Sequence, residues 1–155
     1  MDEKFFAAAI HNRALTAAAL LVGRIFMGVL FITFGMSKAI YTPQIQQYMA
    51  AHHVAIDLVY LTIPVQIGFG VLMVIGYHTR FAAMMLAGFC IIATSLFHAD
   101  FHQRGELAHF LKDFAIAGGF LFVMAHGPGA YSLDALLKRL PEGDKIAEPL
   151  ATRSR

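Results

Sequence analysis

The side chains of this sequence that could do acid–base or metal chemistry gather in one stretch, residues 97–113. Three of the eight histidines fall within it, and Lys112 and Asp113 close it. Long apolar runs precede and follow this stretch. Imidazole groups exchange protons near neutral pH, and imidazoles and carboxylates both bind metal ions. A polar stretch between two apolar runs is therefore where we expect a reaction or a ligand-binding site.

A metal site is the sharpest hypothesis for the histidines. His98 and His102 are four residues apart, so on a helix they would share one face and could hold one ion. Asp100, Glu106 or His109 would add ligands, and a haem held between helices is a variant. The sequence contains no HExxH zinc motif and no CxxC pair. Histidines that hydrogen-bond to lipid headgroups are the more ordinary interpretation, which makes metal and haem the less favoured cofactors.

Composition indicates the class of protein that must position these groups. Of the 155 residues, 58% are hydrophobic and 14% are charged. A soluble domain carries about 25% charged residues, so the deficit favours a membrane protein over a soluble helical bundle. The net charge of +2, without a basic stripe, argues against a nucleic-acid partner. The lipid bilayer is therefore the first expected partner.

Four apolar segments have close to the length that a helix needs to cross a bilayer, about 20 residues. Their composition, rich in Ala, Leu, Met and Phe, favours helices. The sequence predicts an all-α fold, an integral membrane four-helix bundle with short interfacial helices. The predicted spans cover residues 14–36, 58–75, 81–97 and 109–125.

The short helices and the chain ends complete the expected organisation. Thr42-Pro43 is typical of an N-cap followed by the first helical residue, and Ser132 is expected to cap a second short helix. We expect one membrane domain, residues 14–137. A polar head, residues 1–13, precedes it, and a polar tail, residues 138–155, follows it.

The distribution of basic residues predicts the orientation in the membrane. With four spans, both termini and the loop around Arg80 share one side, which holds eight Lys and Arg residues. The other side holds three, Lys38, Arg104 and Lys112. Basic loops stay in the cytoplasm, so both termini are expected to be cytoplasmic. The histidine-rich stretch then lies at the outer face.

Polar residues inside the spans need partners, because a charge at mid-bilayer costs at least ~2.5 kcal/mol. At about 1.5 Å per helical residue, Arg24 and Gln66 fall at similar depth near the middle of the membrane. Lys38 and Asp113 fall near the outer boundary. The sequence predicts that Arg24 pairs with Gln66 and the Tyr60 carbonyl, and that Lys38 pairs with Asp113.

These residues combine into one predicted site, a polar pocket that opens to the outer face. His98 ends one span where His109 begins the next, and Lys112 lies about one turn deeper. Such a pocket would place proton donors and acceptors beside an aromatic interior, as a quinone headgroup requires. A salt-bridged plug that only seals the bundle is the alternative. The predicted set is Arg24, Lys38, Gln66, His98, His109, Lys112 and Asp113.

Several short motifs, taken in order, are similar to those of a known family. The first span contains Arg24-x3-Gly28-x2-Phe31-x3-Gly35-x2-Lys38. His98 closes the third span, and Phe110-Leu111-Lys112-Asp113 and Gly118-Gly119 lie in the fourth. Gly127-Pro128-Gly129-x2-Ser132-Leu133-Asp134 completes the series. Over residues 20–137 the chain resembles the DoxX family of small bacterial four-helix membrane proteins.

The resemblance implies a setting more than a reaction. DoxX-family members are linked to quinol oxidase and thiosulfate:quinone oxidoreductase systems and to thiol-stress complexes, which implies a redox context in the bacterial inner membrane. Two positions depart from the family pattern. Gln66 stands where the family usually has glutamate, and Asp113 stands where it usually has asparagine. The acid has in effect moved from the second span to the fourth.

Three functional classes follow from these observations. The first is a redox-linked membrane subunit that binds quinone or a small thiol. The second is a non-catalytic anchor or assembly partner of a soluble oxidoreductase. The third, a transporter of a small solute or metal, is the weakest, because four helices enclose a narrow path unless a homo-oligomer forms, and no inverted repeat is visible.

Overall fold

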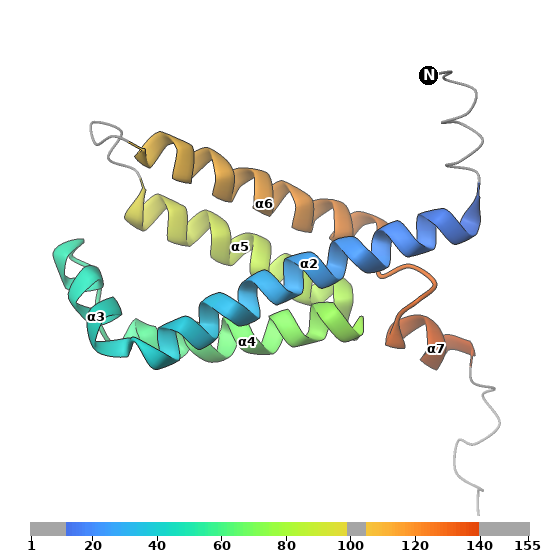
Figure 1. Cartoon of the computed structure of the whole chain (residues 1–155), viewed down its shortest axis with the longest axis horizontal. Coiled ribbons are helices and arrows are strands. Elements are labelled where there is room, and N and C mark those ends of the chain that lie inside the picture. Colours follow the sequence, from blue (N-terminus) through green and yellow to red (C-terminus); the bar gives the residue numbers. More distant parts are fainter. Residues whose placement is uncertain (1–11, 99–104, 140–155) are drawn as a thin grey trace, which may run out of the picture.

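The computed structural model describes residues 12–98 and 105–139, and within those ranges the chain forms helices and no strand. The all-α prediction is confirmed. The helices are α2 (Arg13–Ile40), α3 (Thr42–Ala51), α4 (Leu58–Ile75), α5 (Thr79–Phe97), α6 (Glu106–His126) and α7 (Leu133–Arg139) (Figure 1).

Four of these helices, α2, α4, α5 and α6, are long and apolar enough to cross a membrane, as predicted. The predicted second span coincides with α4 at both ends, where the left-handed Gly76 stops the helix. The other three helices extend past the predicted spans by a few residues. α2 continues through Ser37 and Lys38 to Ile40, because polar residues at the bilayer boundary end a span without ending a helix.

The four long helices pack as two pairs, α2 along α4 and α5 along α6. Glycine makes the first pair close. A Cβ atom added to Gly28 would lie 2.7 Å from the Gly70 carbonyl oxygen, and one added to Gly70 would lie 2.9 Å from the Gly28 carbonyl oxygen. The two backbones therefore touch where any side chain would separate them.

Aromatic rings join the two pairs. Phe31 of α2 makes edge contacts with Phe120 of α6 at 5.2 Å between ring centroids and with Phe89 of α5 at 6.1 Å. The remaining buried core lies toward the turn between α4 and α5, where Met73 and Leu86 are inaccessible to solvent. In the opposite direction the two pairs diverge (Figure 1).

The short helix α3 lies at the diverging end. Its N-cap is Tyr41, and Thr42, predicted as the cap, is the first helical residue, with its hydroxyl donating to the Lys38 carbonyl at 2.8 Å. The Tyr48 ring stacks on Phe97 of α5 at 5.4 Å, so α3 bridges the two helix pairs. We call this end, with α3, the end of α5 and the start of α6, the α3 end.

The opposite end is formed by α7, the turn between α4 and α5, and the end of α6, and we call it the α7 end. α7 continues through Lys138 to Arg139, residues that the sequence assigned to the tail. The predicted head and most of the predicted tail, residues 1–11 and 140–155, lie outside the described residues.

Candidate functional site

A cavity of about 560 Å³ lies between the diverging helix pairs at the α3 end. This volume is within the range of small-molecule sites, about 300–1,000 Å³. Its walls are mostly apolar and include side chains of five helices, α2 to α6. Six of the seven residues predicted to form the pocket line this cavity: Lys38, Gln66, His98, His109, Lys112 and Asp113.

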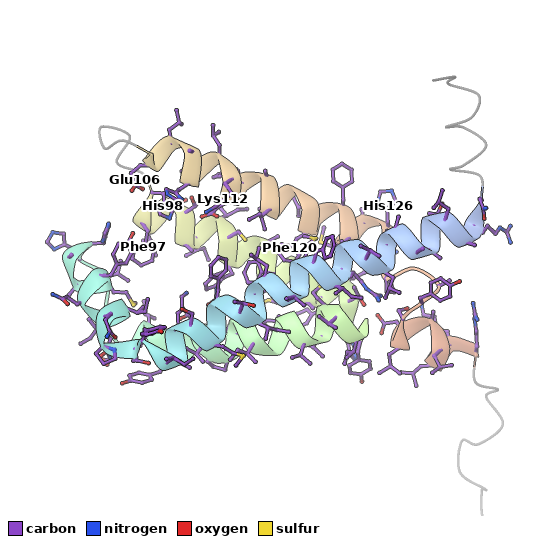
Figure 2. The ribbon with its side chains drawn as sticks, viewed as in Figure 1. Phe97, His98, Glu106, Lys112, Phe120 and His126 are labelled. Atoms are coloured by element: carbon purple, nitrogen blue, oxygen red, sulfur yellow. The ribbon has the colours of Figure 1, made fainter. Side chains whose placement is uncertain are left out.

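A run of proton-exchanging groups borders the cavity on α5 and α6. The His98 Nδ1 atom lies 2.6 Å from a carboxylate oxygen of Glu106, and the His98 and His109 rings stack at 5.2 Å. The His109 Nδ1 atom lies 3.3 Å from the Lys112 Nζ atom. Figure 2 shows His98, Glu106 and Lys112 together at this end and His126 at the other. These groups can each exchange protons near the cavity, in two hydrogen-bonded pairs, Glu106 with His98 and His109 with Lys112, that meet through the stacked imidazole rings.

Glu106 is a partner that the sequence did not predict for His98. It was considered only as a further metal ligand. The two residues belong to different helices, separated by a connection outside the described residues. They meet because His98 is the C-cap of α5 and Glu106 is the first residue of α6.

The predicted ion pair between Lys38 and Asp113 is wrong. The Asp113 carboxylate lies 3.9 Å from Nζ of Lys112, its neighbour on α6. The Lys38 ammonium instead lies over the Phe89 ring, 5.1 Å from the centroid. Lys112 reaches Asp113 without crossing the bundle, whereas Lys38 would have to span the gap between the diverging pairs. Within residues 12–98 and 105–139, Lys38 has no carboxylate partner.

Gln66 is the most deeply buried polar residue of the cavity wall. Its side chain is 3% exposed, and its Oε1 atom has no hydrogen-bond partner among the described residues. An unpaired buried amide costs about 1–3 kcal/mol, and such groups are rare in native structures. Gln66 is therefore a buried polar group of the cavity wall that the described residues do not satisfy.

Arg24 is the one predicted pocket residue that does not line the cavity. It is 1% exposed and lies at the α7 end, where its guanidinium donates to the Pro128 carbonyl at 2.7 Å and to the Tyr131 carbonyl at 2.8 Å. The predicted pairing with Gln66 is wrong. α2 has 28 residues and α4 has 18, so depths counted from one end do not align the two helices.

The neighbours of Arg24 and Gln66 show the size of this error. A Cβ atom added to Gly35 would lie 3.2 Å from the Gln66 Cβ atom, so Gln66 is level with Gly35 on α2. A Cβ atom added to Gly76, at the end of α4, would lie 2.9 Å from the Arg24 Cζ atom. Arg24 and Gly35 are separated by ~16 Å along the helix, which places Arg24 and Gln66 in different environments.

Asp134 completes the polar cluster at the α7 end. Its carboxylate accepts hydrogen bonds from the backbone N–H groups of His78 and Thr79, at 2.9 and 3.0 Å, and from the Thr79 hydroxyl at 3.0 Å. Partial burial would raise the pKa of Asp134, but these hydrogen bonds hold it below its ordinary value. The sequence did not assign Asp134 a role, although it stands in the last of the family-like motifs.

Tyr48 lines the cavity, and the sequence did not predict it as part of the site. Burial, together with the negative charge of Glu106, raises the pKa of its phenol. Tyr48 therefore stays neutral and able to donate a hydrogen bond at the α3 end. Its position on a short interfacial helix gave no sign that the ring would reach the cavity.

The metal hypothesis cannot be placed as a whole, because His102 lies outside the described residues. Within residues 12–98 and 105–139, no three His, Cys, Asp or Glu side chains gather closely enough to hold a metal ion. His98 is instead bonded to Glu106. A metal at His98 and His102 stays a prediction.

With this geometry in place, comparison with known proteins gives the family. The DoxX family model matches residues 19–99. This range begins within α2, before Arg24, and ends just after α5 and His98. The chain belongs to the DoxX family. Within that matched region lie Lys38 and Gln66, two of the cavity residues.

Two relatives of this DoxX protein come from Escherichia coli (strain K12). The inner membrane protein YqjF is 39% identical over 127 residues, which is 82% of this chain and 98% of that protein. The inner membrane protein YphA is 30% identical over 122 residues, 74% of this chain and 87% of that protein. No solved structure matches the chain significantly. These similarities identify the family, and the names of the two relatives give no ligand.

Proposed function

We propose that this DoxX-family protein is a redox-linked membrane subunit that binds the polar head of a quinone, or a small thiol, in the α3-end cavity. The observation that carries the proposal is the buried, unpaired Oε1 atom of Gln66 in the wall of an apolar cavity of about 560 Å³. Sites for small molecules combine apolar walls with a few convergent polar groups, as this cavity does.

The run from Glu106 through His98 and His109 to Lys112 supports a redox role. Quinones and thiols gain or lose protons as they gain or lose electrons, and a site for them benefits from groups that exchange protons. His98 and Glu106 are each about one-fifth exposed at their side chains, so the run reaches from solvent to the cavity wall. The proposal assigns these groups to proton exchange with the bound molecule.

We also propose that the protein lies in the bacterial inner membrane with both termini in the cytoplasm, which places the α3 end at the outer face. The eight-to-three distribution of Lys and Arg supports this orientation, and both relatives are named inner membrane proteins. Reporter fusions at the C-terminus and near Arg104 test it. A C-terminal reporter that is active only in the periplasm would contradict it.

The ligand proposal is tested by purifying the full chain in mild detergent, recording its absorbance spectrum, extracting bound molecules for mass spectrometry, and titrating short-chain quinones and small thiols. Gln66→Leu should weaken the binding of such a molecule about tenfold. Gln47→Leu, the same change at an exposed residue of α3, is the matched control and should bind normally. Neither a quinone nor a thiol on the wild type, together with a stable complex with a soluble oxidoreductase, would favour the anchor function instead.

A further inference from the structure

The charged groups that line the α3-end cavity are unequally paired. Three groups of fixed charge line it: the ammonium groups of Lys38 and Lys112 and the carboxylate of Asp113. At this end, Asp113 lies 3.9 Å from the Lys112 ammonium group, and Glu106 is hydrogen-bonded to His98. Lys38 is left as a cation of the cavity without a carboxylate among the described residues.

We propose that the natural ligand of this cavity has an acidic head on an apolar chain, and that Lys38 binds the head in its anionic form. The inference rests on one part of the proposed function, that the α3-end cavity is a ligand site, and it puts an acidic head in the place of the quinone or thiol; binding of the carboxylate or phosphate without any quinone or thiol would support it and refute that ligand. It separates an anionic amphiphile, such as a long-chain carboxylate or a single-chain lipid phosphate, from a neutral quinone ring.

The surroundings of the Lys38 ammonium leave hydrogen-bond donors for an anion. Its described neighbour is the face of Phe89, at 5.1 Å from the ring centroid. An aromatic face attracts a cation without taking its N–H donors as a carboxylate or carbonyl oxygen would, and an ammonium group has three such donors. A carboxylate or phosphate oxygen from a ligand would use them.

Gln66 is placed to bind the same head. It packs level with Gly35 on α2, where an added Cβ atom would lie 3.2 Å from the Gln66 Cβ atom. Lys38 follows Gly35 by three residues and so lies one helical turn further along the same side of α2. The Gln66 amide can turn its Nε2 donors or its Oε1 acceptor toward a ligand. An acidic head therefore meets an ammonium group and an amide within about one turn of helix, a rise of ~5 Å.

The apolar chain has a route out of the cavity toward the bilayer. Leu61 of α4 and Ile92 of α5 both line the cavity and are yet 61% and 63% exposed, so they form its rim. Leu96, also half-exposed, extends this apolar rim along α5. Both helices are candidate membrane spans, so these exposed side chains face lipid. A chain that leaves between them stays in an apolar environment, which favours a ligand dissolved in the membrane.

The test uses the full chain in nanodiscs of zwitterionic lipid and a set of amphiphiles that share one saturated chain. Their heads are a carboxylate, a phosphate monoester, a primary alcohol and a trimethylammonium group, and competition against a fluorescent carboxylate gives each Kd. The wild type should bind the carboxylate or the phosphate about tenfold more tightly than the alcohol, and the trimethylammonium compound most weakly. The stronger of the two anions identifies the head.

Variants assign the preference to one residue. Lys38→Met should remove the preference for the anionic heads, and Lys38→Arg should keep it. Lys138→Met, which removes the same charge from an exposed position on α7, should leave it unchanged. Because the preference is measured first on the wild type, the inference is testable even if Lys38→Met fails to accumulate.

Two outcomes separate this inference from the function on which it rests. If a quinone or thiol binds while the carboxylate, phosphate and alcohol bind equally to the wild type, the acidic-head inference is wrong and the proposed function stands. If no quinone, thiol or amphiphile binds, the cavity is not a ligand site, and both are wrong. A preference for anions that survives in Lys38→Met would also overturn the role of Lys38.

Discussion

The two ends of the bundle satisfy their buried polar groups in opposite ways. At the α7 end, two carbonyl groups accept hydrogen bonds from Arg24, and Asp134 accepts three hydrogen bonds from the turn before α5. At the α3 end, Gln66 and Lys38 line a cavity, and the amide oxygen of Gln66 and the ammonium group of Lys38 find no carboxylate or hydrogen-bond partner within residues 12–98 and 105–139.

The difference indicates different roles for the two ends. A polar network whose members satisfy each other stabilises one arrangement of helices, and removing a member leaves its partners unpaired. Unpaired polar groups around a cavity destabilise the protein until a ligand or water completes them. We therefore interpret the α7 end as the structural lock of the bundle and the α3 end as its binding site. One nitrogen of Arg24, Nε, lacks a partner in the described structure, so the lock is not fully satisfied.

The largest expected effect is at Arg24. Arg24→Met leaves the carbonyls of Pro128 and Tyr131 without their donor and removes the cation near Asp134. We expect a loss of about 3 kcal/mol in the free energy of unfolding, seen as a lower Tm in detergent. Arg139→Met, the same replacement at an exposed residue of α7, is the control. A normal Tm for Arg24→Met would mean that the α7 end is not a lock.

Asp134→Asn should have the next largest effect, about 1–3 kcal/mol, because hydrogen bonds to a charged acceptor are lost. The pKa of Asp134 is lowered in the fold from its ordinary value of 3.8. Its stabilisation is therefore present above that value and is lost as the pH falls through the lowered pKa. The Tm difference between wild type and Asp134→Asn, measured from pH 7 downward, should shrink below about pH 4. A Tm difference that grows as the pH falls would contradict the lowered pKa of Asp134.

At the α3 end we expect a substitution to raise the stability of the protein instead of lowering it. Gln66→Leu replaces an unpaired buried amide with an apolar side chain of similar size, so the ligand-free protein should gain about 1 kcal/mol of stability. Denaturation of ligand-free protein, compared with Gln47→Leu, measures this gain. A loss of several kcal/mol would show that Gln66 is part of a second structural network, as the plug alternative requires.

The smallest effect concerns Tyr48. Tyr48→Phe keeps the ring that stacks on Phe97 and removes only the hydroxyl. The free energy of unfolding should therefore change by about 0.5 kcal/mol or less, seen as a nearly unchanged Tm. The phenol pKa is raised, so Tyr48 should ionise later than an ordinary tyrosine. The difference between the ultraviolet pH titrations of wild type and Tyr48→Phe should show one phenol that ionises above about pH 10. A Tyr48 phenol that ionises below pH 10 would contradict the raised pKa.

The sequence predicted the fold because each span is a continuous apolar segment whose length matches a bilayer. It also brought together most of the site, because His98 and His109 lie at helix ends joined by a short connection and Lys112 and Asp113 follow within one turn. What could not be predicted depends on how the helices slide past one another. Arg24 was aligned with Gln66 because the glycine contacts that set the register of α2 on α4 are long-range.

Two partners were missed for related reasons. Glu106 and His98 lie on either side of a connection outside the described residues, and Asp134 lies after the turn at residues 127–129 but binds the backbone at the start of α5. Neither contact leaves a spacing signal in the sequence. Asp134 stood in a family-like motif, which was the available signal.

The central claim is that the α7 end stabilises the bundle and the α3 end binds the ligand. The most direct test compares Arg24→Met with Gln66→Leu. For each variant it measures the Tm of the ligand-free protein and the ligand Kd per folded molecule. Our account predicts that Arg24→Met lowers Tm and leaves the Kd of the remaining folded protein unchanged. It predicts that Gln66→Leu keeps or raises Tm and weakens binding about tenfold. If both variants lower Tm and neither changes the Kd, the two ends do not differ in role, and the α3-end cavity is not the binding site.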